Sequence, residues 1–84
     1  MYYVYILKSQ KDFQFYTGLT KDVSRRLQEH NSGQVKPTKG RRPLMVVYTE
    51  QVATLSEARN REKFFKTGSG RLYRDKMLKT NIPR

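Results

Sequence analysis

Hydrophobic residues at both odd and even positions fill the start of the chain and predict a strand. Residues 2–8 read YYVYILK, and tyrosine, valine and isoleucine favour extended backbone. Because neighbouring side chains of a strand point to opposite faces, both faces of this segment are apolar. We therefore expect a strand covered on both sides, not one at a sheet edge. Polar residues 9–12 predict a turn, and residues 13–18 predict the returning strand of a hairpin.

A helical pattern follows the hairpin. Thr20 suits the N-cap of a helix that runs to about Asn31, with Asp22 in its first turn. Residues 34–43 carry two prolines and a glycine and predict a basic loop. Residues 44–49, LMVVYT, predict a third strand.

Two further helices are predicted in the C-terminal part. Thr54 and Glu57 have the spacing of a capping box, and the helix that they begin ends near Lys66. A shorter helix over residues 71–79 has a basic face and an apolar side. That apolar side consists of Leu72, Tyr73, Met77 and Leu78. The element order β-β-α-β-α-α predicts an α+β fold in which helices pack on a short antiparallel or mixed sheet.

Length and composition restrict the kind of protein. The 84 residues suffice for one domain and not for two, so we expect a single domain over residues 1–84. The sequence has no cysteine, and no apolar run approaches the roughly 20 residues of a membrane helix. The N-terminal apolar stretch breaks at Lys8, too early for a signal peptide. We expect a cytoplasmic protein that does not enter a membrane.

The net charge says more about the partners of the protein than its size does. Eighteen lysines and arginines stand against seven acidic residues, giving a formal net charge of +11. Such an excess favours polyanionic partners, with nucleic acid first and an acidic membrane surface second, while a merely soluble basic surface is the alternative. The cations expected to hold a phosphate backbone, or otherwise to form solvated faces, are Lys36, Lys39, Arg41 and Arg42 of the loop and Arg71 and Arg74 of the last helix.

One acidic residue lies on an otherwise apolar stripe. Leu55, Ala58, Glu62 and Phe65 share one face of the second predicted helix. A carboxylate on that face needs a cation or must become neutral, because burying it unpaired is unfavourable. The pattern leaves three alternatives open for Glu62: an arginine partner, a metal ion, or a position at the edge of the stripe in contact with water.

The first predicted helix carries a second polar pair beside apolar residues. Arg26 and His30 are four residues apart and therefore lie on one face, next to Val23 and Leu27. Taken singly, the histidine suits a helix C-terminus and the arginine suits the surface. Their joint position makes them candidate site residues.

Three tyrosines complete the set of candidate residues. Tyr3 and Tyr5 share one face of the first strand, and Tyr16 lies on the paired strand, two residues before Gly18. A buried tyrosine needs a hydrogen-bond partner for its hydroxyl, so these residues belong either to an ordinary aromatic core or to a polar site.

Four sequence blocks in order resemble the GIY-YIG nuclease domain, most closely its small stand-alone members. These blocks are YYVYILKS, FYTGLTKDVSRRLQEHNSG, TKGRRPLMVVY and EARNREKFFKTGSGR, and together they cover nearly the whole chain. The resemblance implies a three-stranded antiparallel sheet flanked by helices. Two departures are visible: Tyr3 and Val4 replace the glycine and isoleucine of the first motif, and Thr17 replaces the central isoleucine of the second.

The resemblance also implies a site that cleaves phosphodiester bonds with one divalent ion, Mg²⁺ or Mn²⁺. Glu62 matches the metal-binding glutamate and Arg26 the helix arginine, which suits a phosphate oxygen. Tyr5 would orient or deprotonate the attacking water, with Tyr16 and His30 in support, although any of these three is a candidate base. Positive charge from Arg26 and the metal is expected to lower the pKa of a tyrosine base. Gly18 closes the second motif and permits a close approach of backbone or substrate.

The expected function is therefore a metal-dependent endonuclease acting on DNA, including branched or damaged DNA, in repair or recombination. RNA is not excluded as a substrate. Because a domain this small stands alone, it could also act with a protein partner or as a homodimer. The main alternative is a non-catalytic, basic nucleic-acid-binding module of the same fold. A third hypothesis is a small basic protein that acts through a protein partner.

Overall fold

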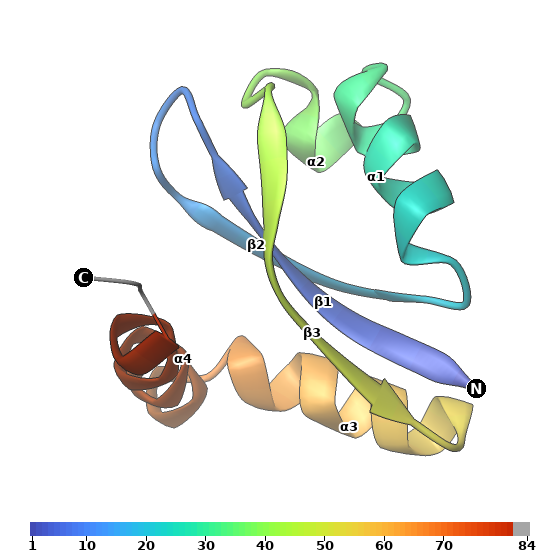
Figure 1. Ribbon diagram of the computed structural model, residues 1–84, viewed down its shortest axis with the longest axis vertical. Coiled ribbons are helices and arrows are strands. Elements are labelled where there is room, and N and C mark those ends of the chain that lie inside the picture. Colours follow the sequence, from blue (N-terminus) through green and yellow to red (C-terminus); the bar gives the residue numbers. More distant parts are fainter. Residues whose placement is uncertain (82–84) are drawn as a thin grey trace.

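The computed structural model describes residues 1–81, in which a three-stranded antiparallel sheet carries helices on both faces (Figure 1). The strands are β1 (Tyr2–Ser9), β2 (Phe15–Thr20) and β3 (Leu44–Val52), in the order β2-β1-β3. The helices are α1 (Val23–Asn31), α2 (Lys36–Lys39), α3 (Leu55–Phe65) and α4 (Gly68–Asn81). The α+β class and the β-β-α-β-α-α order are confirmed, with α2 as an additional single turn.

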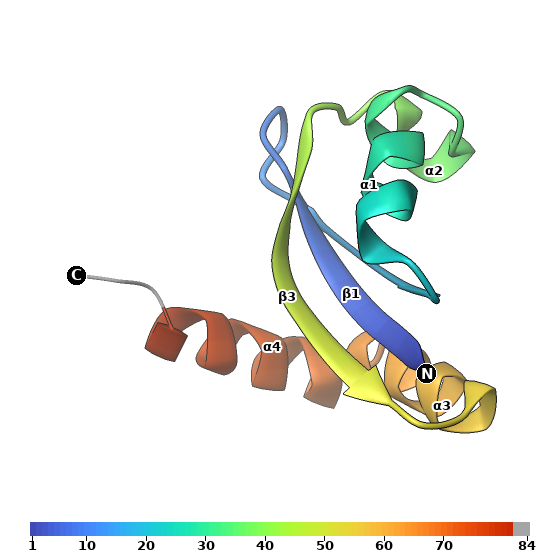
Figure 2. The same cartoon turned by 45° about the vertical axis from the view of Figure 1, so that its right-hand side comes forward.

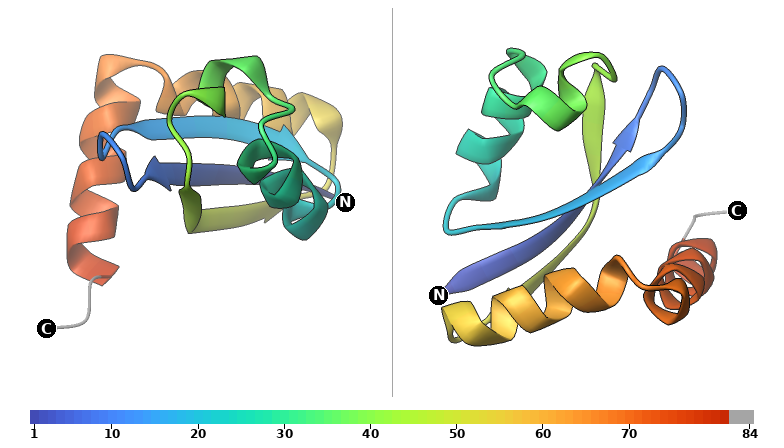
Figure 3. Two further views of the ribbon diagram at one scale, coloured as in Figure 1. Left: turned by 90° about the horizontal axis from the view of Figure 1, so that it is seen from above. Right: turned by 180° about the vertical axis from the view of Figure 1, so that it is seen from behind.

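The central strand β1 is covered on both faces, as its apolar pattern predicts. On one face Val4 and Ile6 pack with Ala58 and Phe65 of α3. On the other face Tyr5 and its neighbours form a second cluster beneath α1 and α2. That second cluster contains Tyr5, Leu7 and Leu44, with Tyr16, Leu27 and Val46 around it. Seen from behind, α1 and α2 lie on one side of β2 and α3 on the other (Figure 3).

The first helix begins later than the sequence predicts. Thr20 is the last residue of β2, where it pairs with Tyr3, so it does not cap α1. Asp22 is the N-cap instead, and its carboxylate accepts a hydrogen bond from the Arg25 backbone N–H at 3.0 Å. The predicted placement of Asp22 in the first turn was therefore wrong, because the β1–β2 ladder holds Thr20 in extended backbone.

The hairpin and the segment after α1 also differ from prediction. Strand β2 starts at Phe15, because Phe13 adopts a positive φ of 59° inside the turn. The predicted loop over residues 34–43 contains the single helical turn α2. Pro37 lies in the first turn of α2, where a missing backbone N–H removes no helical hydrogen bond, so this proline starts a helix rather than breaking one.

Helix α3 has the predicted bounds, whereas α4 is longer than predicted at both ends. Thr54 caps α3 and its hydroxyl accepts a hydrogen bond from the Glu57 backbone N–H at 3.1 Å. Helix α4 extends beyond the predicted residues 71–79 and projects past the end of the sheet (Figure 2). Leu72 on its predicted apolar side is 73% exposed, so that side is only partly covered. No helix within residues 1–81 has the length and apolar character needed to cross a membrane.

The junction between α3 and α4 depends on the glycine at position 70. A Cβ at Gly70 would overlap the backbone carbonyl of Phe64, which cannot rotate away. We expect Gly70→Ala to lower the free energy of unfolding by about 1–3 kcal/mol, the usual range for overpacking. The matched control is Gly68→Ala, since a Cβ there meets no atom within 4 Å. Urea denaturation of both variants tests this, and equal midpoints would contradict the close approach.

Candidate active site

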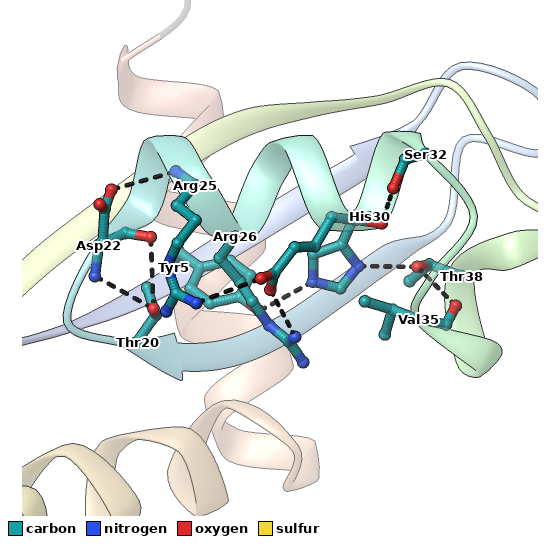
Figure 4. Close-up of polar contacts among 10 residues, drawn as sticks. Tyr5, Thr20, Asp22, Arg25, Arg26, His30, Ser32, Val35 and Thr38 are labelled. Carbon is teal, nitrogen blue, oxygen red and sulfur yellow. Dashed lines mark hydrogen bonds and ion pairs between the residues drawn. The ribbon is translucent and has the colours of Figure 1, made fainter.

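The hydroxyl of Tyr5 lies at the centre of the candidate site. Tyr5 belongs to β1 and pairs directly with Gly18 of β2, and its side chain is turned toward α1 (Figure 4). The residue is 2% exposed. A Cβ at Gly18 would overlap the hydroxyl and ring of Tyr5, so the glycine makes room for this phenol. The close approach expected at Gly18 is thus made by a side chain of the paired strand.

A row of buried hydrogen bonds connects Tyr5 to α2. The Tyr5 hydroxyl lies 2.9 Å from Nε2 of His30, and Nδ1 of His30 lies 2.7 Å from Oγ1 of Thr38 (Figure 4). The Thr38 hydroxyl donates in turn to the Val35 carbonyl at 3.3 Å. His30 and Thr38 are both fully buried. Strand β1 and helices α1 and α2 therefore meet around the imidazole of His30.

Tyr16 packs against the same imidazole from the second strand. Its ring meets the His30 ring edge-on, with centroids 5.1 Å apart, and the Tyr5 ring makes a similar contact at 5.8 Å. Tyr16 is only half-buried, so it is more open to solvent than Tyr5 or His30.

Arg26 borders the phenol and is oriented by a glutamate. Its Nη1 donates to Oε1 of Glu29 at 3.0 Å, while Glu29 also accepts from Arg25 at 3.2 Å. The guanidinium of Arg26 is half-buried and lies beside the Tyr5 hydroxyl. Sequence analysis missed Glu29, although its spacing of three and four residues from the two arginines is a usable signal.

Burial governs the ionisation of both buried groups. It raises the pKa of Tyr5, and the polar contact and charge of Arg26 only partly oppose it. In the protein without a bound ion, burial therefore raises the pKa of Tyr5 by more than Arg26 lowers it. Burial, followed by the positive charge of Arg26, lowers the pKa of His30 below its usual value. His30 is consequently neutral at pH 7.

Glu62 approaches the site from the opposite face of the sheet. It lies on α3, which packs against both β1 and β2, and its charge adds to the rise in the Tyr5 pKa. Its side chain is 26% exposed, and its carboxylate lies 3.7 Å from Lys66 one helical turn away. Glu62 thus lies at the edge of the stripe in contact with water, and its cationic partner is a lysine instead of an arginine.

The cations expected to bind phosphate fall into two groups. Lys36, Lys39, Arg42 and Arg71 are exposed. Arg41 and Arg74 are engaged: Arg41 is paired with Asp12 at 3.2 Å, and Arg74 is paired with Asp75 and lies over the Phe15 ring at 4.2 Å. At 14% exposure, the side chain of Arg74 contributes mainly to packing.

Three exposed cations border one shallow cavity near α2. The cavity measures about 450 Å³ and is lined by Lys11, Lys39 and Arg42 together with Asn31, Gly40 and Pro43. Lys11 comes from the β1–β2 turn, and sequence analysis did not select it. The hairpin turn and the α2 segment together form a cationic hollow with no acidic lining residue.

Comparison with known proteins decides the family. Residues 1–75 match the GIY-YIG catalytic domain. The chain belongs to the GIY-YIG family. This is a family of nucleases, generally endonucleases that use divalent metal ions, so its substrates are nucleic acids. The GIY-YIG signature positions of this chain, Tyr3–Tyr5 and Tyr16–Gly18, lie on the paired strands β1 and β2.

Small proteins of similar length resemble this GIY-YIG chain. A UPF0213 protein of Staphylococcus saprophyticus is 48% identical over 79 residues, which is 93% of this chain and 90% of that protein. A UPF0213 protein of Staphylococcus aureus is 49% identical over 67 residues, covering 79% and 80% of the two chains. The solution NMR structure of a UPF0213 protein from Bacillus halodurans superposes with a TM-score of 0.58 at 37% identity, covering 96% of this chain and 86% of that one.

The depressed pKa of His30 predicts a pH-dependent stability. Because the folded-state pKa lies below the unfolded value, the unfolded chain binds more protons at acidic pH. The free energy of unfolding should therefore fall as pH decreases below about 6.5, by at most about 1.4 kcal/mol per pH unit. Because the sequence has one histidine and carboxyl groups titrate at lower pH, this window reports on His30.

Urea denaturation between about pH 7.5 and pH 5 measures this effect. The control is His30→Gln, which keeps polar groups at the site without a titratable ring, and its midpoint should change less over the same interval. An equally steep loss of stability in both proteins would contradict the assignment to His30.

Proposed function

We propose that this protein is a divalent-metal-dependent endonuclease that hydrolyses phosphodiester bonds in DNA. The observation that supports this best is the convergence of the Tyr5 phenol, the buried His30 and the half-buried Arg26 at one point of the β1–β2 hairpin. Glu62 lies near enough for its charge to disfavour ionisation of Tyr5. Such a set offers a proton acceptor, a phosphate ligand and a metal ligand around one phenol.

The surroundings of Glu62 fit a Mg²⁺ or Mn²⁺ ion. Its carboxylate reaches solvent and its contact with Lys66 is long, so oxygen lone pairs remain available. Within residues 1–81 there is no cluster of three or more acidic or histidine side chains suited to a metal. A single carboxylate suits Mg²⁺, which retains several waters in protein sites. When bound, the ion would supply an activated water and offset the charge that develops on the phosphate.

Arg26 is suited to hold a non-bridging phosphate oxygen. A guanidinium has five N–H donors, and the hydrogen bond to Glu29 uses only one of them. That bond also restrains the rotation of the side chain, which directs the remaining donors before substrate binds. Glu29 is thus proposed as the residue that orients Arg26.

Tyr5 is the proposed acceptor of the proton from the attacking water. His30 has no exposed surface, so it acts through Tyr5 rather than on water itself. Tyr16 is proposed to support the imidazole through its edge-on ring contact. Gly18 is proposed to keep the space in which the Tyr5 hydroxyl sits.

The exposed cations around α2 support DNA as the substrate and suggest how it is selected. Lys39 and Arg42 border the cationic hollow, and Lys36 and Arg71 are also exposed. Contacts to phosphates carry little sequence information, so we infer selection by DNA shape, as in branched or damaged DNA. This selection would suit repair or recombination in the cytoplasm. Residues 1–84 are proposed to act as one domain, alone or as a homodimer.

Substitution of Glu62 tests the metal site. We expect Glu62→Gln to reduce cleavage by about 10²-fold or more, because the amide is a poor ligand for a divalent ion. Glu57→Gln on the same helix is the matched control and should cleave normally. The assay uses single-stranded, duplex and branched DNA with Mg²⁺, Mn²⁺ or a chelator. Equal cleavage by all three proteins would indicate a contaminating nuclease, and binding without cleavage would favour the non-catalytic module.

Removing the positive charges that line the cationic hollow tests the proposed DNA interface. We expect Lys39→Gln and Arg42→Gln each to weaken duplex binding on all sequences alike. For each DNA phosphate that a variant no longer neutralises, the slope of log K against log salt should decrease by about 0.9. Lys63→Gln, on α3 across the sheet, removes the same charge and should leave the slope unchanged. An equal decrease in all three variants would indicate a general effect of net charge instead of a defined interface.

A further inference from the structure

The buried hydroxyl of Thr38 has no part in the hydrolysis proposed above. Thr38 lies in α2, within a segment whose sequence suggests only phosphate binding. It is fully buried and bonded at once to Nδ1 of His30 at 2.7 Å and to the Val35 carbonyl at 3.3 Å (Figure 4). Its position between a backbone group and a titratable ring allows it to control where the ring proton lies.

The direction of each hydrogen bond in this row follows from its last member. A backbone carbonyl has no proton to give, so the Thr38 hydroxyl donates to Val35. With its proton given to Val35, the Thr38 oxygen is left to accept, so we assign the proton of the 2.7 Å contact with His30 to Nδ1. A neutral imidazole carries one N–H, so Nε2 is an acceptor. The Tyr5 hydroxyl therefore donates its proton to Nε2 of His30.

The surroundings of His30 favour the neutral ring that this row of hydrogen bonds needs. The charged groups near it are Arg26 and Glu29 of α1, and the phenols of Tyr5 and Tyr16 face it from the sheet. Burial and Arg26 both lower the pKa of the imidazole, against a smaller opposing effect of Glu29.

We propose that Thr38 is a positioning residue that fixes His30 in the Nδ1–H tautomer and thereby turns the lone pairs of the Tyr5 oxygen toward the attacking water. The catalytic part of this inference rests on the proposed nuclease function, while the tautomer itself does not. In the opposite tautomer Nε2–H would donate to Tyr5 and occupy the oxygen that has to receive a proton.

The proposed proton transfer is balanced. The O–H bond of the attacking water breaks, and its proton passes to the Tyr5 oxygen as the Tyr5 proton passes to Nε2 of His30. The water oxygen forms the new bond to phosphorus with the electron pair that is released. The bond from phosphorus to the leaving oxygen breaks with its pair, and that oxygen takes a proton from solvent. The imidazolium keeps its Nδ1–H bond to Thr38 and later returns the extra proton through Tyr5.

The tautomer can be measured directly, because the chain has a single histidine. Long-range ¹⁵N–¹H NMR spectra of the ring distinguish a protonated from an unprotonated nitrogen at neutral pH. In the wild-type protein we expect Nδ1 to be protonated and Nε2 to be unprotonated. The Nε2–H tautomer in the wild-type protein would overturn the proposal, whatever the variants do.

Three variants test the role of Thr38. Thr38→Val keeps the shape of the side chain without its hydroxyl, and should move the ring to the Nε2–H tautomer. Thr38→Ser keeps the hydroxyl and should retain the wild-type tautomer. Thr17→Val, a buried threonine on the α3 face of the sheet, should also retain it. A folded Thr38→Val protein whose ring stays in the Nδ1–H form would overturn the proposal.

Cleavage assays separate the tautomer from its catalytic consequence. We expect Thr38→Val to lower kcat by about 10- to 100-fold with little change in KM, and Thr38→Ser to restore most of the rate. A wild-type protein with the expected tautomer and no cleavage would reject the nuclease function and leave the tautomer assignment standing. A switched tautomer with an unchanged kcat would reject Thr38 as a positioning residue for catalysis.

Discussion

A fully buried imidazole needs partners for both of its nitrogens, and this requirement organises the site. His30 meets it with Tyr5 of β1 on one side and Thr38 of α2 on the other. Leaving either nitrogen unpaired in the interior would cost roughly 1–3 kcal/mol. Satisfying both fixes the distance between the central strand, α1 and α2. The same two hydrogen bonds that stabilise this face of the sheet also define where the phenol proton lies.

The hairpin register explains why a glycine accompanies the two tyrosines. Tyr5 pairs with Gly18 and Leu7 with Tyr16, so the phenols share one face of the sheet at neighbouring positions. The ring of Tyr5 lies across the backbone of β2, in space that any larger residue at position 18 would fill. A shift of this pairing by one residue would put the two phenols on opposite faces of the sheet, with one of them on the face covered by α3. The strand register and the small size of Gly18 therefore together determine where the two phenols lie.

Local patterns predicted the parts of the fold that local physics determines. The two apolar faces of β1 identified a central strand, and Thr54 identified the start of α3. The predicted start of α1 was wrong because Thr20 pairs with Tyr3 in the sheet, and strand pairing does not follow from the local sequence. Glu62 and His30 were recognisable as polar residues on apolar faces. Thr38 was not, since a threonine in a basic, proline-containing segment carries no sign of the imidazole eight residues earlier.

Their ion pairs distinguish Glu62 from Glu29 and Glu50, in a chain with a net charge of +11. Glu29 and Glu50 each accept hydrogen bonds from arginines at 3.2 Å or less, which satisfies much of their charge. Within residues 1–81, the ion pair of Glu62 is with Lys66 at 3.7 Å, although cations are abundant. A carboxylate in this state, near enough to Tyr5 to raise its pKa, would repel a phosphate group bound there. A divalent ion between the two would reverse that repulsion, because it attracts both the carboxylate and the phosphate oxygens.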